Sequence, residues 1–218
     1  MEWQWAGNGS TGLRVGKVVC VGRNYVEHAK ELGNTVPEKP LLFLKPSTAV
    51  CSLEEGFAIP RDKGRVHHEL ELAVLMGNWL KDGSEQEARQ AMAGIGLALD
   101  LTLRDRQEEL KQQGYPWEEA KAFDDSCPTS RFIPMAEIEQ LDAIPLALHR
   151  NGELRQSGHS GQMIIPILKL ISHISRIFTL EPGDVVLTGT PAGVGELAPG
   201  DELIVEIPGK MRVLSQVR

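Results

Sequence analysis

Apolar and polar residues alternate along several short stretches of the chain, which is the pattern of β-strands that bury one face. In the clearest stretch, Val66–Met76, Glu69 and Glu71 take one face while Leu70 and Leu72 take the other. Similar but shorter patterns predict strands at Lys17–Val21, Leu41–Leu44, Ile95–Leu103, Leu146–His149, Glu153–Gln156, Val185–Leu187 and Leu203–Ile207. The pair Asn151-Gly152, between the predicted strands Leu146–His149 and Glu153–Gln156, predicts a tight hairpin.

Helix signals are fewer. A short helix is expected from Tyr25 to Leu32, between Asn24 as its N-cap and Gly33 as its end. Because about eight residues are marginal as an isolated helix, it must be held by packing or be free to order and disorder. Other helices are expected at Ser84–Ala93, at Arg104–Gln113 and after Pro166, where Ile167, Ile171, Ile174 and Phe178 form an apolar stripe.

The order of these elements indicates the fold class. Strands are not regularly separated by crossover helices, so an α+β protein is expected, mainly β, with a large mixed or antiparallel sheet. No internal repeat and no linker divides the 218 residues, which predicts a single domain.

Composition narrows the possible partners and location. The chain has 23 Lys+Arg against 30 Asp+Glu, a net charge of −7, and no basic tract, which argues against nucleic acid. No apolar run is long enough to cross a membrane. Cys20, Cys51 and Cys127 are too few and too scattered for a disulfide framework or a thiolate zinc site. With no signal-peptide pattern at the N-terminus, a cytoplasmic protein is expected.

Three acids form a candidate metal site. Glu69 and Glu71, two positions apart in a strand, project from one face with Cα atoms about 6.6 Å apart. Alone, such a pair is more typical of a solvated edge strand. Asp100 changes the interpretation because it is a single acid in the apolar run GIGLALDLTL, where a carboxylate needs a charged partner. Three oxygen ligands suit Mg²⁺ or Mn²⁺.

Two further features have an ordinary alternative. His28 and Glu31 are neighbours on the short helix, so the carboxylate can orient the imidazole as a general base, although a surface pair is the commoner case. Lys121, in the run EEAKAF, has an equally ordinary interpretation as an exposed helical lysine.

The loop that begins at Thr188 reads TGTPAGVG and follows a predicted strand. It lacks the Gly-Lys-Ser/Thr ending and the helix of a phosphate loop, so a nucleotide site is disfavoured. Its small residues would still let backbone N–H groups and the Thr190 hydroxyl approach a carboxylate closely.

As a set, these motifs resemble the fumarylacetoacetate hydrolase (FAH) family. The resemblance rests on VGRNY from Val21, FLKPS from Phe43, HHELEL from His67, Asp100, and LTGTP from Leu187. It is greatest to the small acylpyruvase and oxaloacetate decarboxylase branch, the type of FAH domain-containing protein 1. It implies a mixed β-roll with short peripheral helices, homodimeric, in which residues 1–218 form one catalytic domain and residues 1–16 an N-terminal extension.

The resemblance also implies roles for individual residues. Glu69, Glu71 and Asp100 match the metal ligands, and His28 with Glu31 matches a catalytic dyad on a lid helix. Lys121 matches the active-site lysine. The positions implied to bind the substrate are Arg104, Gln107, Gly189 and Thr190.

The expected activity is metal-dependent hydrolysis of the C3–C4 bond of acylpyruvates, a class of 2,4-dioxo acids, to pyruvate and a carboxylic acid through a metal-bound enolate. The same site can instead serve as an oxaloacetate decarboxylase or keto–enol tautomerase, because both reactions pass through the same enolate. A metal-dependent dicarboxylate-binding module is the alternative outside enzymes. It has no use for a base on a mobile helix.

Overall fold

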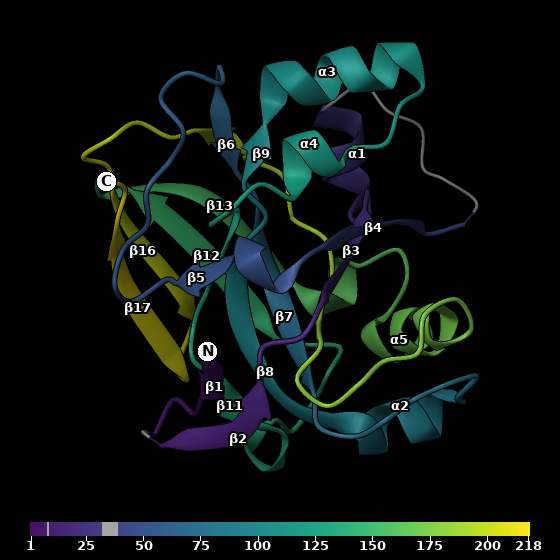
Figure 1. Ribbon diagram of the computed structural model, residues 1–218. Helices are drawn as coiled ribbons and strands as arrows, with labels where there is room; N and C mark the ends of the chain where they lie inside the picture. Colours follow the sequence, from purple (N-terminus) through teal and green to yellow (C-terminus); the bar gives the residue numbers. More distant parts are fainter. Residues whose placement is uncertain (8, 32–38) are drawn as a thin grey trace.

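A mixed β-sheet forms the centre of the molecule (Figure 1). The computed structural model describes residues 1–7, 9–31 and 39–218, and the side chains of residues 28–30 lie outside that description. Among the described residues the sheet has eight strands, in the order β4 (Leu41–Lys45), β3 (Val18–Gly22), β14 (Val185–Leu187), β7 (Leu70–Met76), β8 (Met92–Leu99), β10 (Cys127–Thr129) and β5 (Val50–Ser52), with β11 (Ile133–Pro134) also pairing with β8. All seven residues of β7 are buried.

A second, antiparallel sheet packs beside the first through a shared apolar core. Its strands, in spatial order, are β13 (Glu153–His159), β12 (Pro145–Arg150), β16 (Glu202–Ile207) and β17 (Met211–Gln216). The predicted hairpin joins β12 to β13: Asn151 and Gly152 have φ angles of 52° and 82°, the left-handed geometry that this turn requires.

Two predicted strands are each broken in the structure. The stretch Val66–Met76 divides into β6 (Val66–His68) and β7, and Ile95–Leu103 divides between β8, which begins earlier at Met92, and β9 (Thr102–Leu103). β7 and β8 pair in the large sheet. Beyond the breaks, β6 and β9 pair with each other in a small sheet, in which β6 also pairs with β15 (Gly195–Glu196). Glu69 and Asp100 lie at the two breaks, where Asp100 N–H donates to the Glu69 carbonyl at 2.8 Å.

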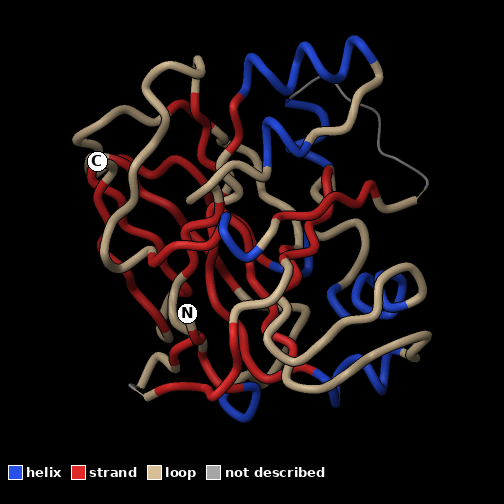
Figure 2. The backbone as a smooth tube through the Cα atoms, viewed as in Figure 1, coloured by secondary structure: helices blue, strands red, loops and turns tan. Residues whose placement is uncertain are grey.

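The helices lie around the strands rather than between them (Figure 2). They are α1 (Val26–Glu31), α2 (Glu85–Ala91), α3 (Arg104–Gln113), α4 (Glu118–Lys121) and α5 (Ile167–Ser175), with 3₁₀ turns at Ser47–Ala49, Met135–Glu137 and Ser160–Gln162. The α3 prediction is confirmed, including its left-handed end at Gly114. The helix after Pro166 ends at Ser175, before Phe178, and α2 ends at Ala91 because Met92 begins β8.

The predicted end of the first helix, at Leu32 and Gly33, lies outside the described residues. The N-terminal strands β1 (Glu2–Gln4) and β2 (Ser10–Arg14) form a separate hairpin. The α+β, mainly β class is confirmed. In the described part of the chain, no helix is long and apolar enough to cross a membrane.

Candidate metal centre and active site

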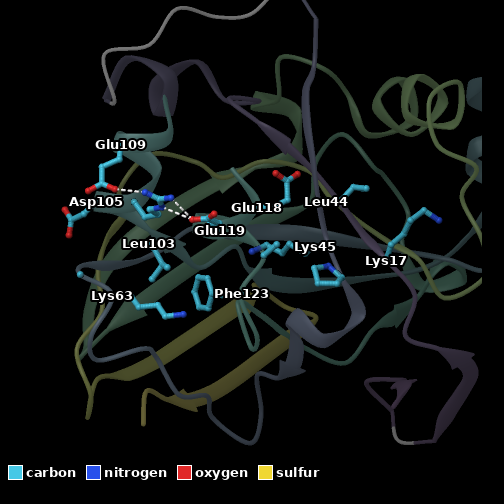
Figure 3. Close-up of a pocket in the computed structure, with 14 residues that line it drawn as sticks. Lys17, Leu44, Lys45, Lys63, Leu103, Asp105, Glu109, Glu118, Glu119 and Phe123 are labelled. Atoms are coloured by element: carbon cyan, nitrogen blue, oxygen red, sulfur yellow. Dashed lines mark hydrogen bonds and ion pairs between the residues drawn. The ribbon is translucent and has the colours of Figure 1, made fainter. Parts of the chain in front are cut away.

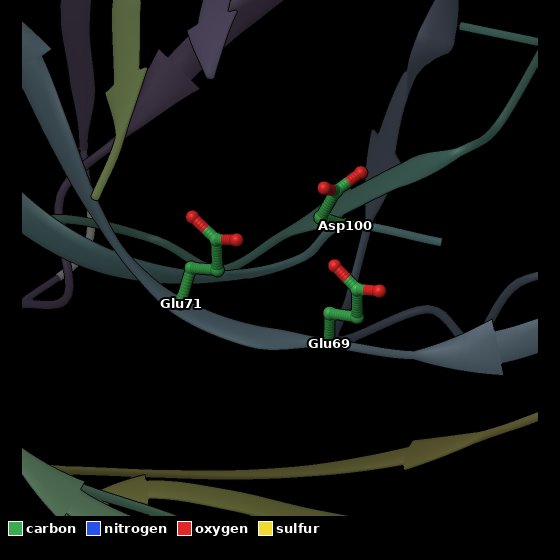
Figure 4. A group of neighbouring side chains, drawn as sticks. All are labelled: Glu69, Glu71 and Asp100. Atoms are coloured by element: carbon green, nitrogen blue, oxygen red, sulfur yellow. The ribbon is translucent and has the colours of Figure 1, made fainter. Parts of the chain in front are cut away.

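Three buried carboxylates converge where the paired strands break. Glu69 comes from the β6–β7 break, Glu71 from β7, and Asp100 from the β8–β9 break. One oxygen of each lies within 4.8 Å of the others, and the three residues are 5%, 2% and 1% exposed. Figure 4 shows the side chains turned toward a common point. The solvated edge-strand alternative is therefore wrong for Glu69 and Glu71.

Three cations surround the acids. Lys121, at the end of α4, donates to Glu69 Oε2 at 2.9 Å and to Asp100 Oδ2 at 2.6 Å. Arg104 Nη2 donates to Glu69 Oε1 at 2.6 Å. Lys45 Nζ forms an ion pair with Asp100 Oδ1 at 2.9 Å. Buried charges are tolerated when they are paired in this way.

Two of these cations differ from the sequence-based picture. Lys121 is 2% exposed, so its interpretation as an exposed helical lysine is wrong. Lys45 is fully buried and also donates to Ser126 O and Ser126 Oγ, each at 3.1 Å, and to the Lys121 carbonyl. The local sequence does not show which residue Lys45 contacts, although a lysine at the end of the apolar run LLFLK indicates a buried partner.

Glu71 is affected both by its burial and by repulsion from the other two acids. Burial, followed by the charges of Asp100 and Glu69, raises the pKa of Glu71 well above its usual value, although a hydrogen bond from Gly189 N–H lowers it in part. Burial would lower the pKa of Lys121, but Asp100 and Glu69 outweigh it and raise that pKa above the usual value. Asp100 and Glu69 therefore favour the charged form of Lys121, whereas the charged form of Glu71 is disfavoured.

The loop after β14 contributes a backbone donor to the triad. Gly189 N–H donates to Glu71 Oε2 at 2.5 Å. Gly189 has a φ of 94°, and a Cβ added there would lie 2.6 Å from Asn24 Cβ, so a side chain would force the loop away. The Asn24 amide holds this junction by donating to Thr188 O at 2.8 Å and to Ile165 O at 3.0 Å.

Gln156, on β13, fixes the direction of the hydrogen bonds at Thr190. Its Oε1 accepts from Leu70 N–H at 3.0 Å, so its Nε2 is the donor to Thr190 Oγ1 at 2.7 Å and to Pro191 O at 2.9 Å. The Thr190 proton has only a 3.4 Å contact with Pro191 O, which leaves it available to a ligand. No local sequence pattern marked Gln156, because its partners come from distant segments.

The acids open into a small pocket of about 30 Å³. Three of the predicted substrate-contacting residues line it, namely Arg104, Gln107 and Thr190. Gln107 accepts from Arg104 Nη1 at 2.7 Å, which orients the guanidinium. About 15 Å³ holds one water, so the pocket has room at least for a cation with a water.

The proposed catalytic dyad is described only in part. His28 belongs to α1, but its side chain lies outside the described residues. The Glu31 carboxylate accepts from Gly193 N–H at 3.1 and 3.2 Å, which links the C-terminus of α1 to the loop that carries Gly189 and Thr190.

A larger cavity of about 1120 Å³ lies beside β4, α3 and α4 (Figure 3). Its wall includes apolar Leu44 and Phe123. The acids Glu109 and Glu119 at its rim are bonded to Arg106 at 2.8 and 2.6 Å. Among the described residues, the group of acids close enough to share an ion is Glu69, Glu71 and Asp100, so we place the chemistry at the smaller pocket.

Comparison with known proteins gives consistent matches over nearly the whole chain. The family model described as fumarylacetoacetate (FAA) hydrolase C-terminal matches residues 17–218. Oxaloacetate tautomerase YcgM from Escherichia coli (strain K12) is 57% identical over 196 residues, which cover 89% of this chain and 90% of that protein. The mitochondrial oxaloacetate decarboxylase of Dictyostelium discoideum is 42% identical over 194 residues, covering 88% and 89%.

A solved structure adds a bound metal to the comparison. Fumarylpyruvate hydrolase from Pseudomonas aeruginosa, in complex with Mn²⁺ and pyruvate, superimposes with a TM-score of 0.93 at 34% identity. The match covers 100% of this chain and 95% of that one.

Proposed function

Because the chain belongs to the fumarylacetoacetate hydrolase family of enzymes, we propose that it interconverts the keto and enol forms of oxaloacetate with the help of a divalent metal ion. The buried triad of Glu69, Glu71 and Asp100 with Lys121 against it is the observation that carries this proposal. The 57% identity to a tautomerase favours this reaction over acylpyruvate hydrolysis, our sequence-based expectation.

The triad fits a hard divalent cation. Its candidate ligands are all carboxylate oxygens, and the raised pKa of Glu71 reflects burial together with a charge repulsion that a cation would relieve. We propose that Glu69, Glu71 and Asp100 hold Mg²⁺, with Mn²⁺ as the other candidate. When bound, the ion would act as a Lewis acid that polarises the C2 carbonyl of a 2-oxo acid.

We assign the other catalytic and substrate-binding roles to residues around the triad. Tautomerisation removes a proton from C3 and places one on the C2 oxygen. Lys121, whose charged form is favoured by Asp100 and Glu69, would stabilise negative charge that develops on the substrate oxygen. We assign the base to His28, oriented by Glu31, and the hydrogen bonds to the substrate carboxylate to Arg104 and Thr190.

Two related reactions remain candidates for the same site. Hydrolysis of an acylpyruvate is favoured by the structural similarity to a fumarylpyruvate hydrolase, and decarboxylation by the Dictyostelium relative. Both share the enolate with tautomerisation and differ in the bond broken. The homodimer and the cytoplasmic location stay predictions.

Product analysis distinguishes the three reactions. The protein is incubated with Mg²⁺ and either enol oxaloacetate or acetylpyruvate, and the products are followed by NMR. Tautomerisation gives keto oxaloacetate faster than the uncatalysed reaction and no excess pyruvate. Excess pyruvate from oxaloacetate would indicate a decarboxylase, and acetate with pyruvate from acetylpyruvate would indicate a hydrolase.

We expect the variant His28→Ala to lower the turnover number for tautomerisation by about 10²- to 10⁴-fold, the usual contribution of a positioned general base. The oxalate dissociation constant should change little, because oxalate has no proton to transfer. Steady-state kinetics and calorimetry at saturating Mg²⁺ measure the two effects. Turnover within about threefold of wild type would remove His28 from the mechanism.

We also expect α1 to respond to ligands. Six residues cannot form a stable helix alone, so the amide hydrogens of Val26–Glu31 should exchange faster than those of α5 in the free protein. Addition of Mg²⁺ and oxalate should slow exchange in α1 and leave α5 unchanged. Equal protection of α1 with and without oxalate would show a fixed structural helix.

A further inference from the structure

Arg23 is a cation at the pocket that the mechanism above does not use. It follows β3 directly, is half-buried and lines the same pocket as the triad. Arg104 and Lys121 each contact an acid of the triad. In the part of the chain that the structure describes, Arg23 has neither a hydrogen-bond partner nor an ion-pair partner for its side chain.

The backbone of Arg23 is held in an unfavourable conformation. Its φ is 62°, in the left-handed region that non-glycine residues rarely adopt. The next residue, Asn24, is fixed by its hydrogen bonds to Thr188 and Ile165, and the preceding residues pair with β4. Strain of this kind persists where it places a side chain for function.

A second basic side chain, Lys111, lies near Arg23. Partial burial and the positive charges of Arg23 and Arg104 lower the pKa of Lys111, so these side chains act on one another. Lys111 also lines the pocket. The pocket is therefore lined by the three acids, by Arg104 and Lys121, which contact those acids, and by the Arg23 guanidinium, which does not. A ligand that binds a metal at one end and carries a second negative charge matches this arrangement.

We propose that the Arg23 guanidinium binds the second carboxylate of a dicarboxylic 2-oxo acid, the one that does not bind the metal, and so makes the site select dicarboxylates over acylpyruvates with uncharged tails. A guanidinium forms two parallel hydrogen bonds to a carboxylate, which suits this role better than a lysine. The assignment rests on the proposed function, since it places the metal-binding end of the substrate at the triad.

The test compares ligands with and without the second carboxylate. Arg23→Asn removes the charge but keeps a residue that tolerates a left-handed φ, and Arg23→Lys keeps the charge without the fork. Arg89→Asn, on the exposed face of α2, is the matched control. The probes, all with Mg²⁺, are oxaloacetate for kinetics, and oxalate and 3,3-difluoro-oxaloacetate, which cannot enolise, for calorimetry.

For Arg23→Asn we expect the KM for oxaloacetate and the Kd for 3,3-difluoro-oxaloacetate to rise about 10- to 100-fold, the usual worth of a charge-assisted hydrogen-bond pair. The kcat and the Kd for oxalate should stay within about threefold, and Tm should equal or exceed that of wild type because strain is relieved. The KM and Kd values of Arg23→Lys should lie between those of wild type and Arg23→Asn, and those of Arg89→Asn should match wild type.

Two results would overturn the assignment. If Arg23→Asn raises the Kd values for oxalate and for 3,3-difluoro-oxaloacetate equally, Arg23 acts on the metal-binding end of the ligand or on the fold. If neither Kd value rises, Arg23 does not contact the ligand. A wild-type protein that binds both ligands but does not tautomerise oxaloacetate would refute the proposed function alone, because the two Kd values still test Arg23.

Discussion

Replacing Glu71 by glutamine is expected to weaken Mg²⁺ binding by at least about 100-fold, because loss of even an outer partner of a metal ligand costs about 10- to 100-fold. Turnover should fall to a similar extent. The free protein should be as stable as wild type or more so. Folding raises the pKa of Glu71, and an acid whose pKa is raised by folding destabilises the folded state at neutral pH.

Thermal unfolding with and without Mg²⁺ checks both halves of this prediction. Wild-type Tm should rise with Mg²⁺, and the Glu71→Gln protein should start at an equal or higher Tm and not respond. Glu139→Gln removes the same charge at an exposed position and should behave as wild type. A Glu71→Gln protein with a normal Mg²⁺ response would mean that the triad is not the metal site.

The second large effect is expected at Lys45. Lys45→Met should lower the free energy of unfolding by about 3 to 5 kcal/mol, the usual cost of removing one partner of a buried ion pair. Asp100 would keep its ion pair with Lys121 but lose the one with Lys45, and Ser126 and the Lys121 carbonyl would lose a buried hydrogen-bond donor. Urea denaturation in metal-free buffer measures this directly.

Lys210→Met is the matched control, since Lys210 is exposed and donates to a backbone carbonyl. Its effect should stay within about 0.5 kcal/mol. A loss below about 1 kcal/mol for Lys45→Met would show that the buried lysine contributes little and that Lys121 alone neutralises Asp100.

The acids of the site could be predicted from sequence because their signal is local. Glu69 and Glu71 alternate with leucines, and Asp100 stands alone in an apolar run. The breaks at Glu69 and Asp100 could not be predicted, because the alternation continues through both positions. They arise from tertiary pairing, because β6 pairs with β9 and β15 in a small sheet while β7 belongs to the large sheet.

The cations and the supporting amide were harder to predict for the same reason. Lys121 belongs to a run typical of an exposed helix, and it is buried because Glu69, 52 positions away, lies against it. Gln156 gains its role from Leu70 and Thr190, which are brought together only by the fold. The family resemblance implied site roles for Lys121 and Arg104, although nothing in the local pattern of either residue indicates burial.

The most direct test of the central claim follows the decay of enol oxaloacetate by its ultraviolet absorbance, with Mg²⁺ present, for wild type and Glu71→Gln in parallel. Pyruvate is measured at the end of each reaction. We predict that wild type accelerates the decay without forming excess pyruvate and that Glu71→Gln leaves the uncatalysed rate unchanged. Equal acceleration by both proteins, or none by wild type at saturating Mg²⁺, would contradict a metal-dependent tautomerase centred on Glu69, Glu71 and Asp100.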